Sequence, residues 1–237
     1  MKSLEVMKEY FPVLLKALPM TFYLLFASVF ISVVLALLLT WARISRHRVI
    51  NMIAGIYVSF MRGTPMMVQL LIIFIFIPML FRELGISTSS WNNSVYAVIA
   101  FSLNMAAFFC EIFRSAYLSI ERGQIEAAES LGMNSIQTFF RVILPQAAAS
   151  ALPNTTNMTI ELMKNTSIAM AIGVYDIMGK GVQLAKNNYG IGQKEIFILI
   201  AVMFWIIGLI FLVLSNYVTG KLNKGNPNYK KKKLFAG

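Results

Sequence analysis

The chain has 237 residues, of which 58% are hydrophobic and only 13% are charged. Soluble domains carry roughly 25% charged residues, so this composition excludes an ordinary soluble protein and indicates an integral membrane protein. The net charge of +11 does not indicate a nucleic-acid-binding protein, because the basic residues cluster beside apolar runs, as they do at the cytoplasmic ends of membrane spans.

Five runs without Asp, Glu, Lys or Arg are long enough to cross a bilayer, which takes about 20 apolar residues. They cover residues 17–42, 63–81, 84–110, 142–160 and 196–220. Residues 50–61 are apolar as well, so the second run belongs to a helix of roughly 30 residues that is interrupted at Arg62-Gly63-Thr64-Pro65. Pro65 removes a backbone hydrogen bond there, which predicts a kink.

The third and fourth spans are shorter or more polar than their charge-free runs suggest. The third is expected to begin near Ser90, because residues 84–91 are rich in Gly, Ser and Thr. The fourth contains two prolines and many small polar residues, so we expect it at about 147–163.

Loop charge predicts how the spans are oriented. The basic loop at 43–48 and the lysines after residue 220 are expected inside the cell, which places the N-terminus outside. Residues 164–195 must then lie outside despite four lysines, and residues 166–172 are a candidate segment for dipping back into the protein. Residues 226–237 are expected to form a basic cytoplasmic tail.

Between the third and fourth spans lies a segment of mixed polarity, which must be in water beside the membrane. A helix at about 122–131 would place Ile125, Ala128 and Leu131 on one face. Gly132 would end that helix, because glycine adopts the left-handed conformation of a helix C-terminus without steric cost.

A second short helix is expected directly after this glycine. Asn134 or Ser135 can cap it, and Pro145 would begin the next span at a helix position where proline is tolerated. The residues that would share one face of it are Ile136, Phe139, Phe140 and Ile143. By itself the pattern leaves two interpretations: a connector at the membrane surface, or a slim helix with acidic flanks that inserts into a groove on another protein.

The spacing in this segment resembles the cytoplasmic Glu-Ala-Ala loop of permease subunits from ATP-binding-cassette (ABC) importers. That loop reads Glu-Ala-Ala, three residues, Gly, nine residues, an apolar residue, any residue and Leu-Pro. Glu126-Ala127-Ala128, Gly132, Val142 and Leu144-Pro145 match it, although isoleucine is commoner than valine at the apolar position.

Further segments resemble the polar amino acid permeases in particular. They are Arg62 to Leu70, Ala106 to Arg114 with the following Gly123 to Ala128, and Lys164-Asn165-Thr166-Ser167. The resemblance implies an all-α integral membrane protein, a type I ABC importer permease-like bundle of about five transmembrane helices with cytoplasmic coupling helices. Residues 1–225 would form this domain, with the coupling loop at about 115–146.

The resemblance also implies partners. A second permease, identical or a paralogue, would complete the pore in the cell membrane, an ABC ATPase dimer would bind below, and an extracellular or periplasmic binding protein would deliver an amino acid. Contact with membrane lipid is expected and contact with nucleic acid is not. The residues implied in coupling to the ATPase are Glu126, Ala127, Ala128, Glu129, Gly132 and Pro145.

ATP and Mg would be used by the partner subunit, because this chain lacks a phosphate-binding loop. The nearest approach, Gly173 to Gly181, is one residue too long and lacks the final hydroxyl. Cys110 lies in an apolar run, and His47 stands between two arginines without clustered metal partners. We therefore expect neither catalysis nor a bound cofactor or metal.

Polar groups at membrane depth normally face protein or a cavity, because they are costly in lipid. The candidates for contact with substrate are Gln69, Asn104, Phe108, Glu111, Asn157, Glu161, Thr166 and Ser167. Glu111 and Asn157 match family positions, while Thr166 and Ser167 lie where the fourth span breaks. The alternative for Asn104, Glu111, Asn157, Thr166 and Ser167 is a bond between helices or to Arg62 or Arg114. For Phe108 the alternative is packing. Glu161 stands where relatives usually have an apolar residue, so its alternative is a position at the lipid edge or the membrane interface.

The substrate class is narrowed by one departure from the family. Asn165 stands where aspartate is common, which weakens the case for a cationic substrate and favours a zwitterionic or polar amino acid, cystine among them. Two other functions remain: an ion-coupled secondary amino acid transporter or channel acting without an ATPase, and a membrane-embedded enzyme. The first leaves the spacing at 126–145 as coincidence, and the second needs a nucleophile or metal cluster that the sequence does not contain.

Overall fold

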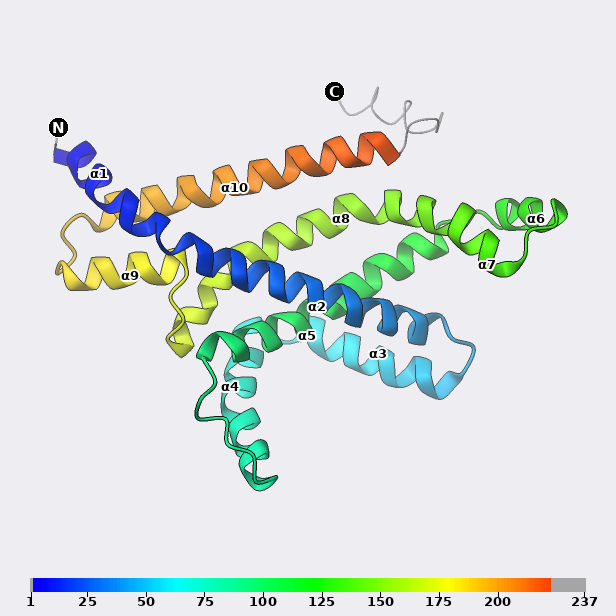
Figure 1. Ribbon diagram of the computed structural model, residues 1–237, viewed down its shortest axis with the longest axis horizontal. Coiled ribbons are helices and arrows are strands. Elements are labelled where there is room, and N and C mark those ends of the chain that lie inside the picture. Colours follow the sequence, from blue (N-terminus) through cyan, green and yellow to red (C-terminus); the bar gives the residue numbers. More distant parts are fainter. Residues whose placement is uncertain (1, 223–237) are drawn as a thin grey trace.

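The computed structural model describes residues 2–222, and this part of the chain is built of helices and connecting turns (Figure 1). In chain order they are α1 (Lys2–Leu15), α2 (Leu18–Ile44), α3 (Arg48–Gly63), α4 (Met66–Glu83), α5 (Asn93–Leu118), α6 (Arg122–Ser130), α7 (Ser135–Thr138), the π-helical turn η1 (Phe139–Ile143), α8 (Leu144–Asn165), the 3-10 helix η2 (Thr166–Ile172), α9 (Ile177–Asn187) and α10 (Gln193–Leu222). The tail expected at 226–237 lies outside the described residues.

Four of the described helices, α2, α4, α5 and α10, are long and apolar enough to cross a membrane. The fourth predicted span corresponds to α8, which does not meet that criterion although its 22 residues reach about 33 Å. Its polar residues Asn154, Asn157 and Glu161 lower its hydropathy. Because α8 packs against both α5 and α10, it belongs to the bundle even though it is too polar to face lipid on every side.

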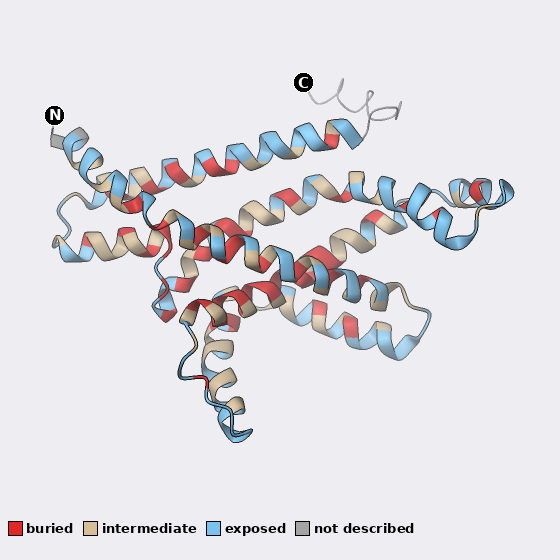
Figure 2. Ribbon diagram, viewed as in Figure 1, coloured by how far each residue is buried: buried red, intermediate tan, exposed pale blue. Residues whose placement is uncertain are grey.

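The centre of the bundle is α5, whose strongest packing partner is α2. Buried residues gather where α2, α5 and α8 meet (Figure 2). Along α2 the side facing α5 is a stripe of small residues, Ser28, Ser32, Ala36 and Thr40, at intervals of four. Small side chains let two helices approach closely, which is how helices associate where lipid offers no hydrophobic driving force.

Hydroxyl groups along this stripe bond to backbone carbonyls of the opposite helix. Ser32 Oγ donates to the carbonyl of Ser102 at 3.2 Å, and Thr40 Oγ1 lies 3.3 Å from the carbonyl of Cys110. In the other direction, Ser102 Oγ donates to the carbonyl of Ser28 at 3.4 Å. The two helices are therefore joined by packing and by polar contacts along much of their length.

The predicted kink near Pro65 is a complete break between α3 and α4. Thr64 and Pro65 both adopt extended backbone angles, with ψ of 146° and 134°. As a result α4 leaves the line of α3 and projects from the body of the bundle (Figure 1). The sequence predicted the position of the interruption correctly but underestimated the change of direction.

Two helices were not expected from the sequence. The chain begins with α1, before the first predicted span, and α1 packs against α9 and α10. The predicted outer loop at 164–195 contains η2 and α9, and Thr166, Ala169 and Ile172 of η2 are buried. Residues 166–172 thus pack into the bundle, as the sequence suggested, and α9 lies over the end of α10.

The packing of α9 on α10 depends on the absence of a side chain at Gly181. A Cβ atom there would lie 2.2 Å from Cδ1 of Ile200 and 3.2 Å from Cγ2 of Ile196. We expect Gly181→Val to lower the free energy of unfolding by about 1–3 kcal/mol, because Ile200 must leave its present rotamer and Ile196 must also give way. Gly220→Val is the matched control, since a Cβ atom at that position would have no neighbour within 4 Å. Equal shifts in the thermal unfolding of the two purified variants would contradict this account.

Candidate functional site

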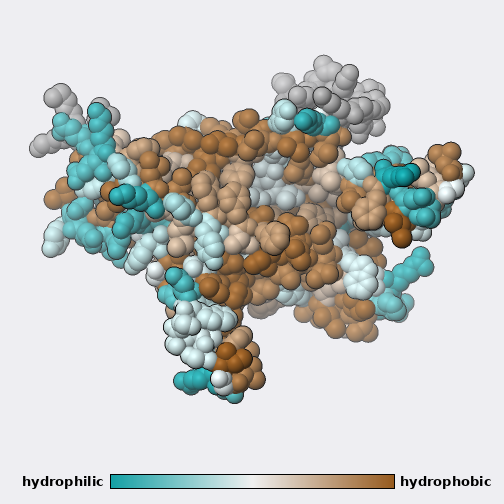
Figure 3. Space-filling view, viewed as in Figure 1, coloured by the Kyte–Doolittle hydropathy of each residue, from teal (hydrophilic) through white to brown (hydrophobic). Residues whose placement is uncertain are grey.

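The first candidate site is the lobe formed by α6 and α7, which extends beyond the bundle at the end opposite the N-terminus (Figure 1). Hydrophilic side chains cover much of this lobe, whereas the flank of the bundle is mainly apolar (Figure 3). Glu126, Ala127 and Glu129 are exposed on α6, and Ala128 is buried. Three of the six predicted coupling residues, Glu126, Ala127 and Glu129, are therefore presented to solvent on one short helix.

The turn after α6 is held by backbone geometry. Gly132 has φ of +77°, its N–H donates to the carbonyl of Glu129, and the N–H of Met133 donates to the carbonyl of Ala128 at 3.1 Å. These two bonds form a Schellman motif, which requires a left-handed residue at the glycine position. The predicted role of Gly132 in ending the helix is confirmed.

The start of α7 is fixed by a capping box, as the sequence suggested for Asn134. The N–H of Gln137 donates to Asn134 Oδ1 at 2.9 Å, and the N–H of Asn134 donates to Gln137 Oε1 at 3.1 Å. The helix continues through η1 into α8, with Pro145 in the first turn of α8 as predicted. Gln146 Nε2 also donates to Gln124 Oε1 at 2.5 Å, which ties α8 back to α6.

Most large apolar residues of the lobe and of the adjoining turn η1 are not covered by this chain. Leu131 is 80% exposed, Ile136 is 71% exposed and Phe140 is 61% exposed, whereas Ile143 is buried. Large apolar side chains exposed together mark a surface that contacts another protein or the membrane. Of the residues predicted to form the apolar faces of the two short helices, only Ala128 and Ile143 are buried in this chain.

A cluster of charges joins α2, α3 and α5 at the end of the bundle nearest this lobe. Glu111 forms an ion pair with Arg114, 2.8 Å between Oε2 and Nη2, and a second with Arg43, 3.5 Å between Oε1 and Nε. Arg43 Nη1 in turn donates to Asn51 Oδ1 at 2.7 Å, and Asn51 Nδ2 donates to the carbonyl of Arg43. The carboxylate of Glu111 is thus engaged between helices, and its predicted contact with substrate stays a prediction.

Gln69 and Asn104 satisfy the carbonyls that the α3–α4 break leaves without helical partners. Gln69 Nε2 donates to the carbonyl of Met61 at 2.9 Å and also reaches the carbonyl of Thr64. Asn104 Nδ2 donates to the same carbonyl of Met61 and to Gln69 Oε1 at 2.9 Å. Both side chains are buried and engaged in bonds between helices, which is the alternative expected for Asn104; the predicted contact of either residue with substrate stays a prediction.

Arg62 and Phe108 lie next to this network. The guanidinium carbon of Arg62 is 5.5 Å from the centroid of the Phe108 ring, within the range of a cation–π contact. Phe108 is half-buried. Phe108 thus contacts Arg62 in the last turn of α3 and also packs against the buried core, the alternative expected for it; its contact with substrate stays a prediction.

On α8, polar side chains line a face that this chain leaves uncovered. Asn154 and Asn157 are exposed, and Glu161 forms an ion pair with Lys164 one turn further along. With Ser150 they recur at intervals of three and four residues, which places them on one side of the helix. We call this set, Ser150, Asn154, Asn157, Glu161 and Lys164, the polar face of α8. Such a face is costly in lipid, so it lies against water or protein.

Thr166 and Ser167 lie beside a buried carboxyl group that the sequence analysis missed. Asp176 is fully buried, caps α9 by accepting the N–H of Gly179 at 2.9 Å, and lies 3.0 Å from Thr166 Oγ1 and 3.4 Å from Ser167 Oγ. Burial raises the pKa of Asp176, and these hydrogen bonds partly oppose the rise. The sequence did not predict α9, so neither the capping role of Asp176 nor its burial was expected.

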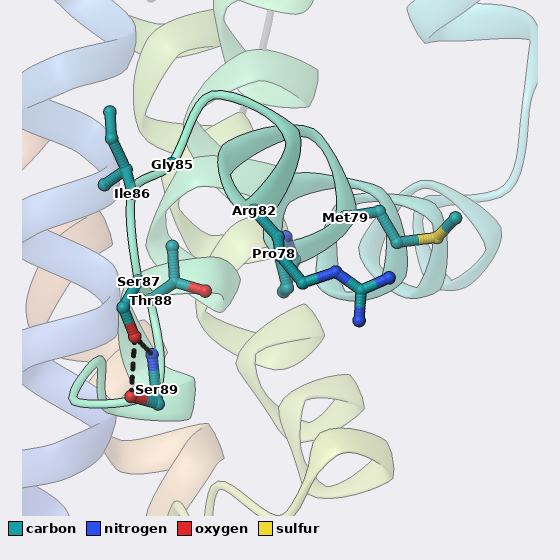
Figure 4. Close-up of a pocket in the computed structure, with 8 residues that line it drawn as sticks. All are labelled: Pro78, Met79, Arg82, Gly85, Ile86, Ser87, Thr88 and Ser89. Atoms are coloured by element: carbon teal, nitrogen blue, oxygen red, sulfur yellow. Dashed lines mark hydrogen bonds between the residues drawn. The ribbon is translucent and has the colours of Figure 1, made fainter.

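The eight predicted substrate residues fall into separate settings within one chain: the helix break, the charge cluster, the polar face of α8 and the surroundings of Asp176. A further hollow of about 480 Å³ lies at the far end of α4, lined by Arg82 and Ser87 among others (Figure 4). Within residues 2–222 no group of three or more His, Cys, Asp or Glu could hold a metal ion.

Residues 29–224 match the family described as "Binding-protein-dependent transport system inner membrane component". The chain is 38% identical over 210 residues to the L-cystine transport system permease protein TcyL of Bacillus subtilis (strain 168), and the match covers 88% of this chain and 87% of TcyL. It is 34% identical over 220 residues to the probable amino-acid permease protein YxeN of the same organism, covering 93% and 96% of the two chains.

Among solved structures, a chain in the crystal structure of an amino acid ABC transporter with histidines superposes with a TM-score of 0.78 at 30% sequence identity. The match covers 91% of this chain and 96% of that chain. The fold of this chain therefore belongs to an architecture known from an amino acid ABC transporter.

The buried carboxyl of Asp176 makes a prediction about pH. Because its pKa is raised above the ordinary value of 3.8, the native state binds more protons than the unfolded state between these two values. The free energy of unfolding is therefore highest on the acid side and falls as pH rises through the native pKa. We expect the thermal midpoint of wild type to fall relative to Asp176→Asn as pH rises from the ordinary carboxyl pKa of 3.8 through the raised native pKa. Parallel pH profiles of the two proteins would contradict a raised pKa.

Proposed function

The chain belongs to the family of inner membrane components of binding-protein-dependent transport systems, and on that premise we propose that it is the permease subunit of an ABC importer for a polar amino acid. The observation in this chain that supports the proposal most directly is the α6–α7 lobe. A rigid turn presents the matched Glu-Ala-Ala and Gly spacing to solvent beside uncovered apolar side chains.

The lobe is suited to docking a separate ATPase dimer, which would use ATP and Mg. Glu126 and Glu129 flank an alanine pair on α6, so the helix is slim enough to enter a groove and carries charge to orient it. Because α7, η1 and α8 are continuous, a movement of the docked lobe reaches α8 without crossing a flexible linker. In this proposal the lobe is cytoplasmic and the N-terminus is outside.

The polar face of α8 is the proposed wall of the passage. One chain leaves Asn154 and Asn157 uncovered, and a second permease, identical or a paralogue, would enclose the face and form a polar pathway between the two copies. The Glu161–Lys164 pair offers both signs of charge, which suits the ammonium and carboxylate groups of a zwitterionic amino acid. The cystine permease named among the relatives makes cystine one candidate.

At the opposite end of the bundle, α1, α9 and the turn between α9 and α10 would face the extracellular or periplasmic binding protein. This end carries Thr166 and Ser167, held by Asp176. A delivered amino acid would enter between the two permeases close to these residues. An ion-coupled transporter or channel would instead move substrate without any ATPase, so the two functions differ in a measurable requirement.

The docking proposal predicts the effect of reversing one charge on α6. Glu126→Arg should reduce the amount of ATPase subunit that co-purifies with the tagged chain from native membranes by at least about tenfold. The reason is that the reversed charge would repel the group on the ATPase that Glu126 attracts. Glu83→Arg, an exposed acid at the far end of α4, is the matched control and should retain the ATPase. If purified wild-type chain moves an amino acid in vesicles with no ATPase present, the importer proposal is wrong.

The proposed passage predicts a separate defect for Asn157→Leu. Uptake of cystine or another polar amino acid by the reconstituted importer should fall by about tenfold, since a hydrogen bond to a charged group contributes roughly 1.5–3 kcal/mol. Co-purification of the ATPase should be unchanged. Asn216→Leu, which replaces an exposed asparagine on α10, should leave uptake at the wild-type level. Unimpaired uptake by the Asn157 variant would remove this residue from the passage.

A further inference from the structure

A groove of about 660 Å³ lies beside the α6–α7 lobe, between the last turns of α2 and α5 and the first turns of α8. In Figure 1, α2 and α8 cross near one end of the molecule and diverge toward the lobe, with the end of α5 between them. The volume of the groove is within the range of small-molecule binding sites, about 300–1,000 Å³. The wall includes Leu37, Trp41, Phe113, Phe139, Ile143 and Ala148.

The groove and the proposed passage use different faces of α8. Leu144, Ala147 and Ala151 line the groove, whereas Asn154 and Asn157 belong to the polar face. At 100° per residue the mean directions of these two sets differ by roughly 80°, a little under a quarter of a turn, so the groove and the polar face adjoin each other on the helix. An amino acid would find few polar partners in the groove, because its wall is apolar except near one end. The groove is therefore suited to an apolar ligand.

Cationic and aromatic side chains mark one end of the groove. Arg46 and Ser45, in the turn between α2 and α3, line it there, and Arg46 makes no ion pair within the described residues. Trp41 is 69% exposed, and Tyr117 lines the same region from α5. Tryptophan and tyrosine collect at the level of lipid headgroups, and arginine lies just beyond them.

We propose that this groove binds an anionic phospholipid from the leaflet on the side of the lobe. An acyl chain would occupy the apolar wall formed by α2, α5 and α8, and the phosphate of the headgroup would lie against Arg46. The charge on the rim distinguishes this ligand from a zwitterionic lipid, whose headgroup gains less from a single unpaired guanidinium group.

A lipid in this position would contact the element that joins the lobe to the bundle. Phe139 and Ile143 belong to η1, and Leu144 begins α8. An occupied groove would brace this π-helical turn against α2 and α5. The ligand would therefore stabilise the connection through which a movement of the lobe reaches α8.

The test is native mass spectrometry of the intact importer in detergent, with phosphatidylglycerol or phosphatidylcholine of matched acyl chains added. We expect phosphatidylglycerol to be retained about fivefold more tightly, the effect of one arginine on an anionic headgroup. Arg46→Gln should abolish that preference. Ala148→Phe, which fills the groove, should reduce retention of both lipids.

Two matched variants serve as controls. Arg82→Gln removes an exposed charge at the far end of α4, and Ala201→Phe adds a ring on an exposed position of α10, so both should retain lipid as wild type does. Equal retention of the two lipids by wild type, or full retention by Ala148→Phe, would overturn the proposal. A cross-link from Ala148→Cys to another protein chain, in a Cys110→Ala background, would also overturn it, since protein would then close the groove.

Discussion

A polar group placed among membrane helices must find its partner within the protein, because lipid supplies none. The stripe Ser28, Ser32, Ala36 and Thr40 meets this requirement while bringing α2 against α5. The small side chains let the two helices approach closely. The hydroxyl groups of Ser32 and Thr40 donate to carbonyls of the opposite helix, so they do not remain without a hydrogen-bond partner inside the membrane. The other helices are arranged around this pair, so their positions depend on how closely it packs.

The same requirement explains the break between α3 and α4. An interrupted helix leaves carbonyls without partners, and here Gln69 and Asn104 supply the missing donors from α4 and α5. The change of direction is therefore stabilised by a buried network rather than by Pro65 alone. Two turns further along α5, Glu111 holds Arg43 and Arg114, so the central helix is tied to the α2–α3–α4 segment by polar contacts at two levels.

The three faces of α8 connect these structural features with function. One face packs into the bundle, a second carries uncovered polar groups, and the third lines an apolar groove with a cationic rim. Because α8 continues from the lobe through η1, this one helix connects the proposed ATPase-docking lobe with the proposed passage and the proposed lipid groove. A partner that moves the lobe thus acts on all three surfaces together.

The sequence by itself determined the membrane class, the position of the helix break, and the turn at Gly132 with its cap at Asn134. These features rest on local rules: charge-free length, the missing N–H of proline, the left-handed conformation of glycine and side-chain capping. Only the tertiary structure decided which polar residues face one another. Gln69, Asn104, Glu111 and Asn157 are all polar residues within predicted membrane spans or at the end of one. The first three bond to other helices, whereas Asn157 is exposed. The burial of Asp176 and the α9–α10 contact at Gly181 depend in the same way on helices distant in sequence, because burial is a property of what packs around a residue and not of the residues beside it in the chain.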